Sequence, residues 1–246
     1  MPRHFDATEF RRKFDQYIAK GEFNETPDYY PRYRSRYEWL TRRFGELAPD
    51  HPIDVLDIGG GQYGVLAKVM YGDRVTVADI GGRLDYVARQ GIRTESWNLA
   101  GDDAPSFGPF DFIIFSEVIE HLPMPGHIPL ERLRRLLRPG GTLICTTPNF
   151  FRLRNIVYVA LGKQIYDHFR YPEDEGLGHV IEYDRERLLW QLQRAGYENI
   201  AISYEHFPHR PYNRLFGAMS ALGAPLFKVP RFRDVLVAIA HAPAQA

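Results

Sequence analysis

The 246-residue sequence contains one cysteine, no excess of charge of either sign and no long apolar run. With Cys145 alone, an intramolecular disulfide is excluded and a reducing compartment fits. Lys+Arg and Asp+Glu both number 31, so the zero net charge argues against nucleic acid or an anionic membrane as the main partner. Neither an apolar signal segment nor a run of membrane-spanning length is present. We therefore expect a cytoplasmic protein with no nucleic-acid partner and no stable membrane insertion.

An ordinary globular composition, 44% hydrophobic and 25% charged, favours a single large domain with additions. Apolar residues at helical spacing before residue 49 predict an N-terminal helical cap over 1–48, ahead of a main domain over 49–246. From residue 54 onward, strand and helix signals alternate, which predicts an α/β fold, a Rossmann-like doubly wound sheet of seven mostly parallel strands. The predicted strands are 55–58, 75–78, 92–97, 110–115, 142–147, 200–204 and 235–240.

Two long insertions interrupt this alternation, 149–183 after strand five and 205–233 after strand six. Both leave from the carboxyl ends of strands, the edge at which ligands bind in such sheets. Since connections of this length are usually functional, we expect both to stand over the ligand site. Aromatic side chains of the first insertion suggest a closed pocket there, namely Tyr158, Tyr166, Phe169 and Tyr171.

The first predicted strand runs into glycines in the stretch V-L-D-I-G-G-G-Q-Y-G. Gly59, Gly61 and Gly64 match the G-x-G-x-x-G spacing of dinucleotide-binding turns, but Asp57 would repel a pyrophosphate at that turn. S-adenosylmethionine carries no phosphate, and its ammonium and sulfonium groups would be attracted by a carboxylate. Asp79 follows about 20 residues later, at the end of the second strand, where an acidic group can accept ribose hydroxyls. The charge pattern therefore favours S-adenosylmethionine over NAD.

Four motifs resemble the ordered motifs of class I S-adenosylmethionine-dependent methyltransferases: V-L-D-I-G-G-G, V-A-D-I, F-D-F-I-I-F-S-E-V-I-E-H-L and L-R-P-G-G-T-L. The sequence is most similar to the broad branch that includes the ubiquinone-biosynthesis O-methyltransferases and many small-molecule methyltransferases. The resemblance covers roughly residues 50–205 and the last strand. It implies the fold and the cofactor, S-adenosyl-L-methionine, but not the methyl acceptor.

The resemblance also implies roles for residues in these motifs. Asp57, Gly59 and Gly61 would hold the methionine end of the cofactor, and Ser116 and Glu117 would flank it near the same portion. Asp79 would hold the ribose. Asn98 stands where aspartate is usual in the family, and its amide could pair with the adenine edge. A turn-forming asparagine is the alternative for Asn98.

Methyl transfer requires alignment of the acceptor and, where needed, removal of a proton. Two histidines are candidates for this catalytic role, His121 in S-E-V-I-E-H-L and His179 in G-H-V-I-E-Y. An imidazole can take a hydroxyl proton near neutral pH. The alternatives are a structural or cofactor-side role for His121 and a hydrogen-bonded loop position for His179. No metal site is expected, because the other histidines considered are scattered along the chain: His4, His51, His168, His206 and His209.

We expect O-methylation of a small molecule, such as a natural product, a sugar or a glycan-pathway intermediate. The N-P-P-Y signature of amide and adenine N-methyltransferases is absent, although N-methylation of a small amine stays an alternative. A cofactor-binding partner subunit without activity is the non-enzymatic alternative.

The segment from Tyr212 to Phe232 carries apolar residues at roughly helical spacing, which predicts a short amphipathic helix. Its apolar face would cover the acceptor pocket as a lid or form a homodimer interface.

Overall fold

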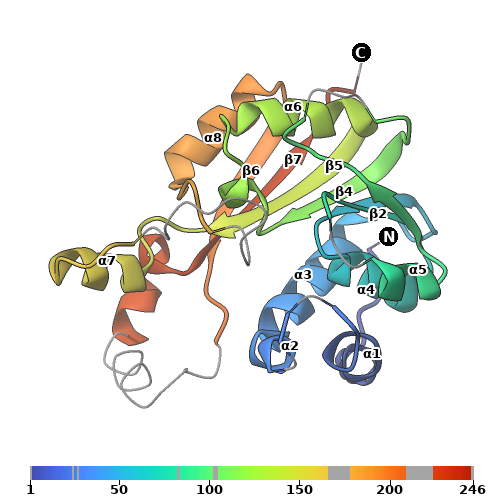
Figure 1. Cartoon of the computed structure of the whole chain (residues 1–246), viewed down its shortest axis with the longest axis horizontal. Helices are drawn as coiled ribbons and strands as arrows, with labels where there is room; N and C mark the ends of the chain where they lie inside the picture. The colour runs from blue at the N-terminus through green and yellow to red at the C-terminus, as the bar shows by residue number, and fades with distance from the viewer. Residues whose placement is uncertain are drawn as a thin grey trace.

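The computed structural model of the chain describes residues 2–23, 25–26, 28–81, 84–101, 105–165, 178–208 and 224–244. Its centre is a seven-stranded sheet in the order β3-β2-β1-β4-β5-β7-β6 (Figure 1). Only the two pairings made by β7 are antiparallel. The strands are β1 Asp54–Ile58, β2 Arg74–Asp79, β3 Arg93–Ser96, β4 Phe110–Ser116, β5 Leu137–Pro148, β6 Glu198–Glu205 and β7 Val235–His241.

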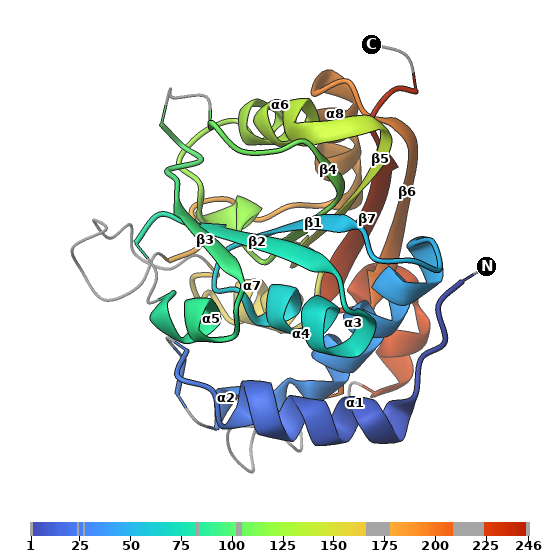
Figure 2. The ribbon, with the colours of Figure 1, turned by 90° about the vertical axis from the view of Figure 1, so that its right-hand side faces the viewer.

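Helices cover both faces of the sheet, which gives three layers. The α-helices are α1 Ala7–Phe14, α2 Tyr29–Arg32, α3 Arg34–Leu47, α4 Gln62–Tyr71, α5 Asp85–Arg89, α6 His127–Leu136, α7 Leu153–Ala160 and α8 Arg185–Arg194. One π-helix, η1 Asp15–Ala19, and three 3₁₀ helices, η2 Ile119–His121, η3 Ala224–Lys228 and η4 Pro230–Phe232, complete the described elements. Figure 2 shows α6 and α8 on one face, with α4, α5 and the N-terminal helices on the other.

This arrangement confirms the predicted α/β class and the mostly parallel, doubly wound seven-stranded sheet. The boundary between α6 and β5 differs from the prediction. The sequence predicts a strand that begins at 142, whereas α6 ends at Leu136 and β5 begins at Leu137. Because a residue before proline disfavours the helical region, Arg138 ahead of Pro139 makes an earlier helix end favourable.

The N-terminal helices share a hydrophobic core with the sheet. Phe10 and Phe14 of α1 and Leu40 and Phe44 of α3 are buried in the same cluster as side chains of α4 and of β1, β2 and β4. The predicted boundary at residue 48 stays a prediction, since these helices are not separated from the sheet by solvent. The cap is thus held by burial against one face of the sheet.

Cys145 is fully buried in β5, where it packs as a small apolar side chain, and burial raises the pKa of its thiol well above its usual value. None of the helices in the described parts of the chain is long and apolar enough to cross a membrane.

Helix α8 begins at a side-chain cap. Asp184 accepts a hydrogen bond from the backbone N–H of Arg187 at 2.8 Å, and aspartate is among the residues preferred at an N-cap. Replacement of Asp184 by alanine is expected to lower the free energy of unfolding by about 1 kcal/mol. Replacement by asparagine should keep most of the stabilisation that the N-cap contributes. Urea unfolding of the two variants measures the difference. Equal stability of the alanine variant and the wild type would contradict the cap's contribution.

Candidate active site

The glycine turn follows β1 and opens α4. Gly59 and Gly61 adopt positive φ values of 112° and 85°, a region that side chains other than glycine rarely enter. A Cβ atom on Gly61 would also lie 2.9 Å from Cγ2 of Val87. The turn therefore needs glycine at these positions for its backbone conformation, and at Gly61 also for its close packing against Val87 of α5.

Asp57 is buried beneath this turn, with only 2% of its surface exposed. Its Oδ2 accepts a hydrogen bond of 2.6 Å from the backbone N–H of Gly64, in the first turn of α4. Burial raises the pKa of Asp57 to about 7, opposed by the Gly64 N–H and reinforced by the neighbouring Asp79 carboxylate. A carboxylate that is this poorly solvated would gain from a nearby cation.

The other two predicted strand-end residues follow from β2 and β3. Asp79 ends β2 and accepts a hydrogen bond from the N–H of Gly81 at 3.2 Å. Asn98 follows β3 and is exposed, and its carboxamide oxygen accepts from the N–H of Ala100 at 3.0 Å. This is the turn-forming contact given as the alternative for Asn98, and it does not involve the amide N–H₂ group, which could donate to an adenine edge.

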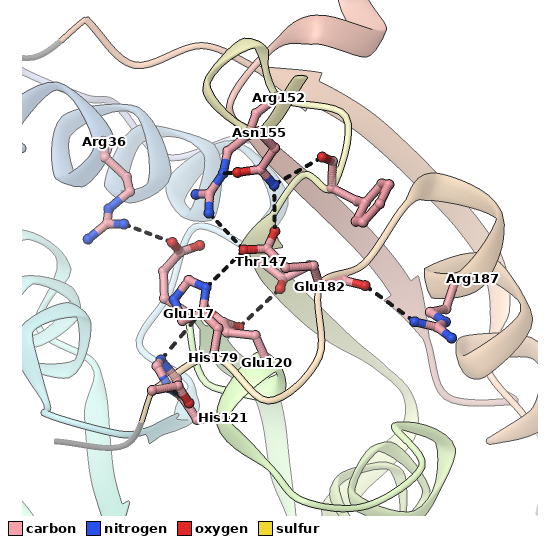
Figure 3. Close-up of polar contacts among 12 residues, drawn as sticks. Arg36, Glu117, Glu120, His121, Thr147, Arg152, Asn155, His179, Glu182 and Arg187 are labelled. Atoms are coloured by element: carbon pink, nitrogen blue, oxygen red, sulfur yellow. Dashed lines mark hydrogen bonds and ion pairs between the residues drawn. The ribbon is translucent and has the colours of Figure 1, made fainter. Parts of the chain in front are cut away.

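Ser116 and Glu117 lie at the end of β4, where the backbone of Glu117 takes a positive φ of 55°. One carboxylate oxygen of Glu117 accepts from Arg36 of α3 at 3.0 Å (Figure 3). The other accepts from the hydroxyl of Thr146 at 2.9 Å. The hydroxyls of Ser116 and Thr146 lie 2.8 Å apart. The N-terminal cap therefore contributes a cation to the carboxyl edge of the sheet.

A cavity of about 700 Å³ lies at this edge. Its walls come from α2 and α3, the end of β4 with η2, α7, and the described parts of both insertions. Representative lining residues are Tyr29, Arg36, Glu117, Tyr158, His206 and Phe227. Tyr166, Phe169 and Tyr171, predicted beside Tyr158, lie outside the described residues, as does the segment 209–223 with most of the predicted lid helix.

His121 and His179 come together on the cavity wall, with their ring centroids 4.9 Å apart. His179 Nδ1 lies 3.1 Å from Oε1 of Glu182, a carboxylate that is 2% exposed. Arg152 and Asn155 donate to the same carboxylate at 2.7 Å and 3.3 Å (Figure 3). Glu182 is thus fixed by two donors and in turn orients the imidazole of His179.

Glu120 is the third polar group in this corner. Its side chain is buried, and its Oε2 accepts from the hydroxyl of Thr147 at 3.0 Å, whereas its Oε1 is buried without a hydrogen-bond partner. Burial and the nearby Glu117 carboxylate raise the pKa of Glu120 well above its usual value. An unpartnered buried carboxylate oxygen is costly unless a ligand satisfies it.

The structure thus brings the predicted residues to one edge of the sheet in two groups, joined by the turn from Ser116 to His121. Sequence reasoning missed Glu120, although it stands in the motif that includes Glu117 and His121. It also missed Arg152, since nothing in the sequence near this residue signals its contact with Glu182 across 30 positions.

Residues 30–202 match a protein family described as a methyltransferase domain. The chain belongs to this family. A ubiquinone biosynthesis O-methyltransferase of Xylella fastidiosa is 36% identical over 123 residues, which cover 46% of this chain and 48% of that protein. The chain therefore spans about half the length of the curated relatives it matches.

Solved structures share the fold. A S-adenosylmethionine-dependent methyltransferase from Archaeoglobus fulgidus is 16% identical over 87% of this chain and 97% of its own, with a TM-score of 0.55. Phosphoethanolamine N-methyltransferase 2 of Haemonchus contortus, in complex with S-adenosyl-L-methionine, is 16% identical with a TM-score of 0.53, over 85% and 52% of the two chains. The family match confirms the predicted class I S-adenosylmethionine-dependent methyltransferase, and these structures share its fold.

The residues present fit this cofactor. The glycines of the turn have no side chains, so a ligand at the carboxyl end of β1 could approach the backbone closely. The acidic groups nearby, Asp57 and Asp79, suit a cationic ligand without phosphate. When bound, S-adenosylmethionine would supply a methyl group, with Asp57, Asp79 and the glycine turn as the residues that would hold it.

Proposed function

We propose that the protein methylates a hydroxyl oxygen of a small molecule bound in the 700 Å³ cavity. The observation that carries this proposal is the oriented His179, held by Glu182 and facing His121 on the wall of that cavity. A hydroxyl loses a proton on methylation, and His179 is placed to take it as general base.

Within this proposal, the cofactor lies along the strand ends. Asp57, Gly59 and Gly61 hold its methionine end, Ser116 and Glu117 flank it, and Asp79 accepts the ribose hydroxyls. Since Ser116 and Glu117 precede η2 directly, the methyl group would be delivered to the corner that holds His121 and His179. Asn98 contributes an adenine contact through its amide N–H₂ group.

The cavity wall suggests the kind of acceptor. Aromatic faces come from Tyr29, Tyr33, Tyr158 and Phe227, and Arg154 lies over the ring of Tyr158 at 5.1 Å. Such walls suit a flat or ring-shaped molecule, as in a natural product or sugar derivative. Similarity to proteins named ubiquinone biosynthesis O-methyltransferase favours oxygen as the acceptor atom.

Replacement of Asp79 by alanine is expected to weaken S-adenosylmethionine binding by about 2 kcal/mol, roughly 30-fold, through loss of two charge-assisted hydrogen bonds. Titration calorimetry measures this change. Asp85→Ala, at an exposed carboxylate on α5, is the matched control and should bind the cofactor as the wild type does. Unchanged affinity in Asp79→Ala would remove Asp79 from the cofactor site.

The acceptor is tested with paired compounds. Release of S-adenosylhomocysteine is measured with phenols, sugars and hydroxylated carboxylic acids, each beside the amine of the same skeleton. Turnover with the hydroxyl member alone supports the proposal. Turnover with the amine alone would favour N-methylation, and cofactor binding without turnover on any member would favour a non-catalytic partner subunit.

Location and assembly complete the proposal. A single buried cysteine suits a reducing, cytoplasmic location. A homodimer would use the apolar face of the segment from Tyr212 to Phe232 as its interface, whereas a monomer would leave that face to cover the cavity. Sedimentation of the protein over a range of concentrations distinguishes the two.

A further inference from the structure

We infer that Glu120, His121 and His179 form a binding site for a divalent transition-metal ion of the Zn²⁺ type. The three side chains each offer one ligand atom, and these atoms lie within 4.8 Å of one another on the wall of the cavity. Two imidazole nitrogens and one carboxylate oxygen are a ligand set that zinc uses in catalytic sites, where a further position stays open. The sequence alone predicted no metal site, because the other histidines considered are scattered along the chain.

The buried oxygen of Glu120 is the independent sign of a ligand. Its side chain is 1% exposed, and Oε1 lies 3.9 Å from Nε2 of His121 without a hydrogen bond. Ligands about 2.1 Å from a tetrahedral zinc ion lie about 3.4 Å from one another. Small rotations of the two imidazoles would therefore close the site around an ion, and the ion would satisfy the buried oxygen.

The surrounding contacts orient the ligands as a metal would require. His179 Nδ1 faces the Glu182 carboxylate at 3.1 Å, and His121 Nδ1 lies 3.2 Å from the carbonyl oxygen of Gly178. A proton on each Nδ1 donates to these acceptors and leaves Nε2 as the ligating atom. Such carboxylate and carbonyl partners accompany most metal-bound histidines. Thr147 holds the second oxygen of Glu120 at 3.0 Å, so Oε1 is the oxygen presented to the ion.

Two imidazoles select among the divalent ions. Magnesium and calcium prefer oxygen ligands, whereas imidazole suits zinc and other first-row transition metals. The site is therefore assigned to the zinc class. The three ligands leave at least one coordination position open toward the cavity.

The open position gives the ion a role toward the acceptor, and this role rests on the proposed function. A hydroxyl oxygen bound there would lose its proton to water more readily, because the cation lowers the pKa of the bound group. The oxygen lone pair then forms the bond to the methyl carbon, and the electron pair of the broken carbon–sulfur bond stays on sulfur. His179 would act as a ligand in this arrangement.

The test uses the full chain, stripped with a chelator and titrated with Zn²⁺ alone, without cofactor or acceptor. Calorimetry with a competing chelator is expected to give about one equivalent of zinc per chain. His121→Ala, His179→Ala and Glu120→Gln should each weaken binding by about 100-fold or more. Glu182 is not a ligand and only orients His179, so Glu182→Gln should weaken zinc binding by about 10-fold. Cobalt absorption bands report histidine ligation by the same site.

His206→Ala is the matched control. His206 also lines the cavity and pairs with a carboxylate, Asp234, at 2.5 Å, but it lies outside the cluster. This variant should bind zinc as the wild type does, and circular dichroism shows whether each variant is folded. Absence of stoichiometric zinc binding by the wild type, or equal binding by folded Glu120→Gln and His121→Ala variants, would overturn the inference. A failure of S-adenosylmethionine binding in a separate titration would instead overturn the proposed function.

Discussion

Replacement of Asp57 by asparagine is expected to stabilise the free protein at pH 8 and to weaken its binding of S-adenosylmethionine. The pKa of the buried carboxyl is about 7 in the folded chain, against about 3.9 in an unfolded chain. At pH values between these two pKa values, the folded chain binds more protons than the unfolded chain, so the free energy of unfolding falls as the pH rises. The full difference is about 4 kcal/mol once the pH has risen through 7.

Asparagine removes the charge but can still accept the hydrogen bond from Gly64. We therefore expect the free energy of unfolding, measured with urea, to fall less between pH 5 and pH 8 in Asp57→Asn than in the wild type. Cofactor titrations in two buffers of different ionisation enthalpy should show proton release near pH 7 in the wild type only, since the cationic cofactor would favour the charged carboxylate. A variant less stable than the wild type at pH 8 would contradict this account.

Asp54→Asn provides the control on the same strand. The neighbouring Arg74 and Arg138 lower the pKa of Asp54, which lies at the opposite end of β1 from the glycine turn. Its replacement removes partly exposed ion pairs, so the expected loss of stability is less than about 1 kcal/mol. Cofactor affinity should not change.

Replacement of His179 by alanine is expected to lower turnover by about 100-fold while leaving the affinity for S-adenosylmethionine intact. The imidazole lies in the corner of the cavity that would receive the acceptor, away from the glycine turn and Asp79. Steady-state kinetics with a responding acceptor and calorimetry with the cofactor measure the two quantities. His127→Ala is the matched control. His127 lies at the start of α6, contacts Gln191 of α8 and does not line the cavity.

The same variant distinguishes proton transfer by His179 from metal-assisted methylation. If the ion carries the acceptor oxygen, a chelator should lower the wild-type turnover to the level of His179→Ala, and zinc should restore it. If His179 acts only as a base, the chelator should have no effect while the variant stays impaired. A fully active His179→Ala protein would exclude both roles and leave proximity, or His121, as the source of catalysis.

Most of the sheet was predictable because its signals are local. The apolar run of β4, the glycines after β1 and the cap at Asp184 each follow from neighbouring residues in the chain. The beginning of β5 was misplaced by five residues, because Leu137 pairs with Phe110 of β4 ahead of an interruption in the register, which resumes at Thr142. Pro139, Gly140 and Gly141 lie in this interruption, where Gly140 has a positive φ of 73°, so their local turn preference is kept and only the pairing of Leu137 with the distant strand was missed.

By itself, the sequence determined the fold class, the methyltransferase family and the charge pattern that favours a phosphate-free cationic cofactor. Only the tertiary structure decided which polar groups meet. Glu182 and Arg152 are 30 residues apart, and His179 reaches Glu120 and His121 only because the segment after residue 178 crosses η2, where Val180 and Ile181 donate to the carbonyl of Glu120. Such contacts depend on the path of the backbone between distant segments. Local propensity and hydrophobic spacing carry no information about that path, so the polar corner and its buried carboxylate appear only in the folded chain.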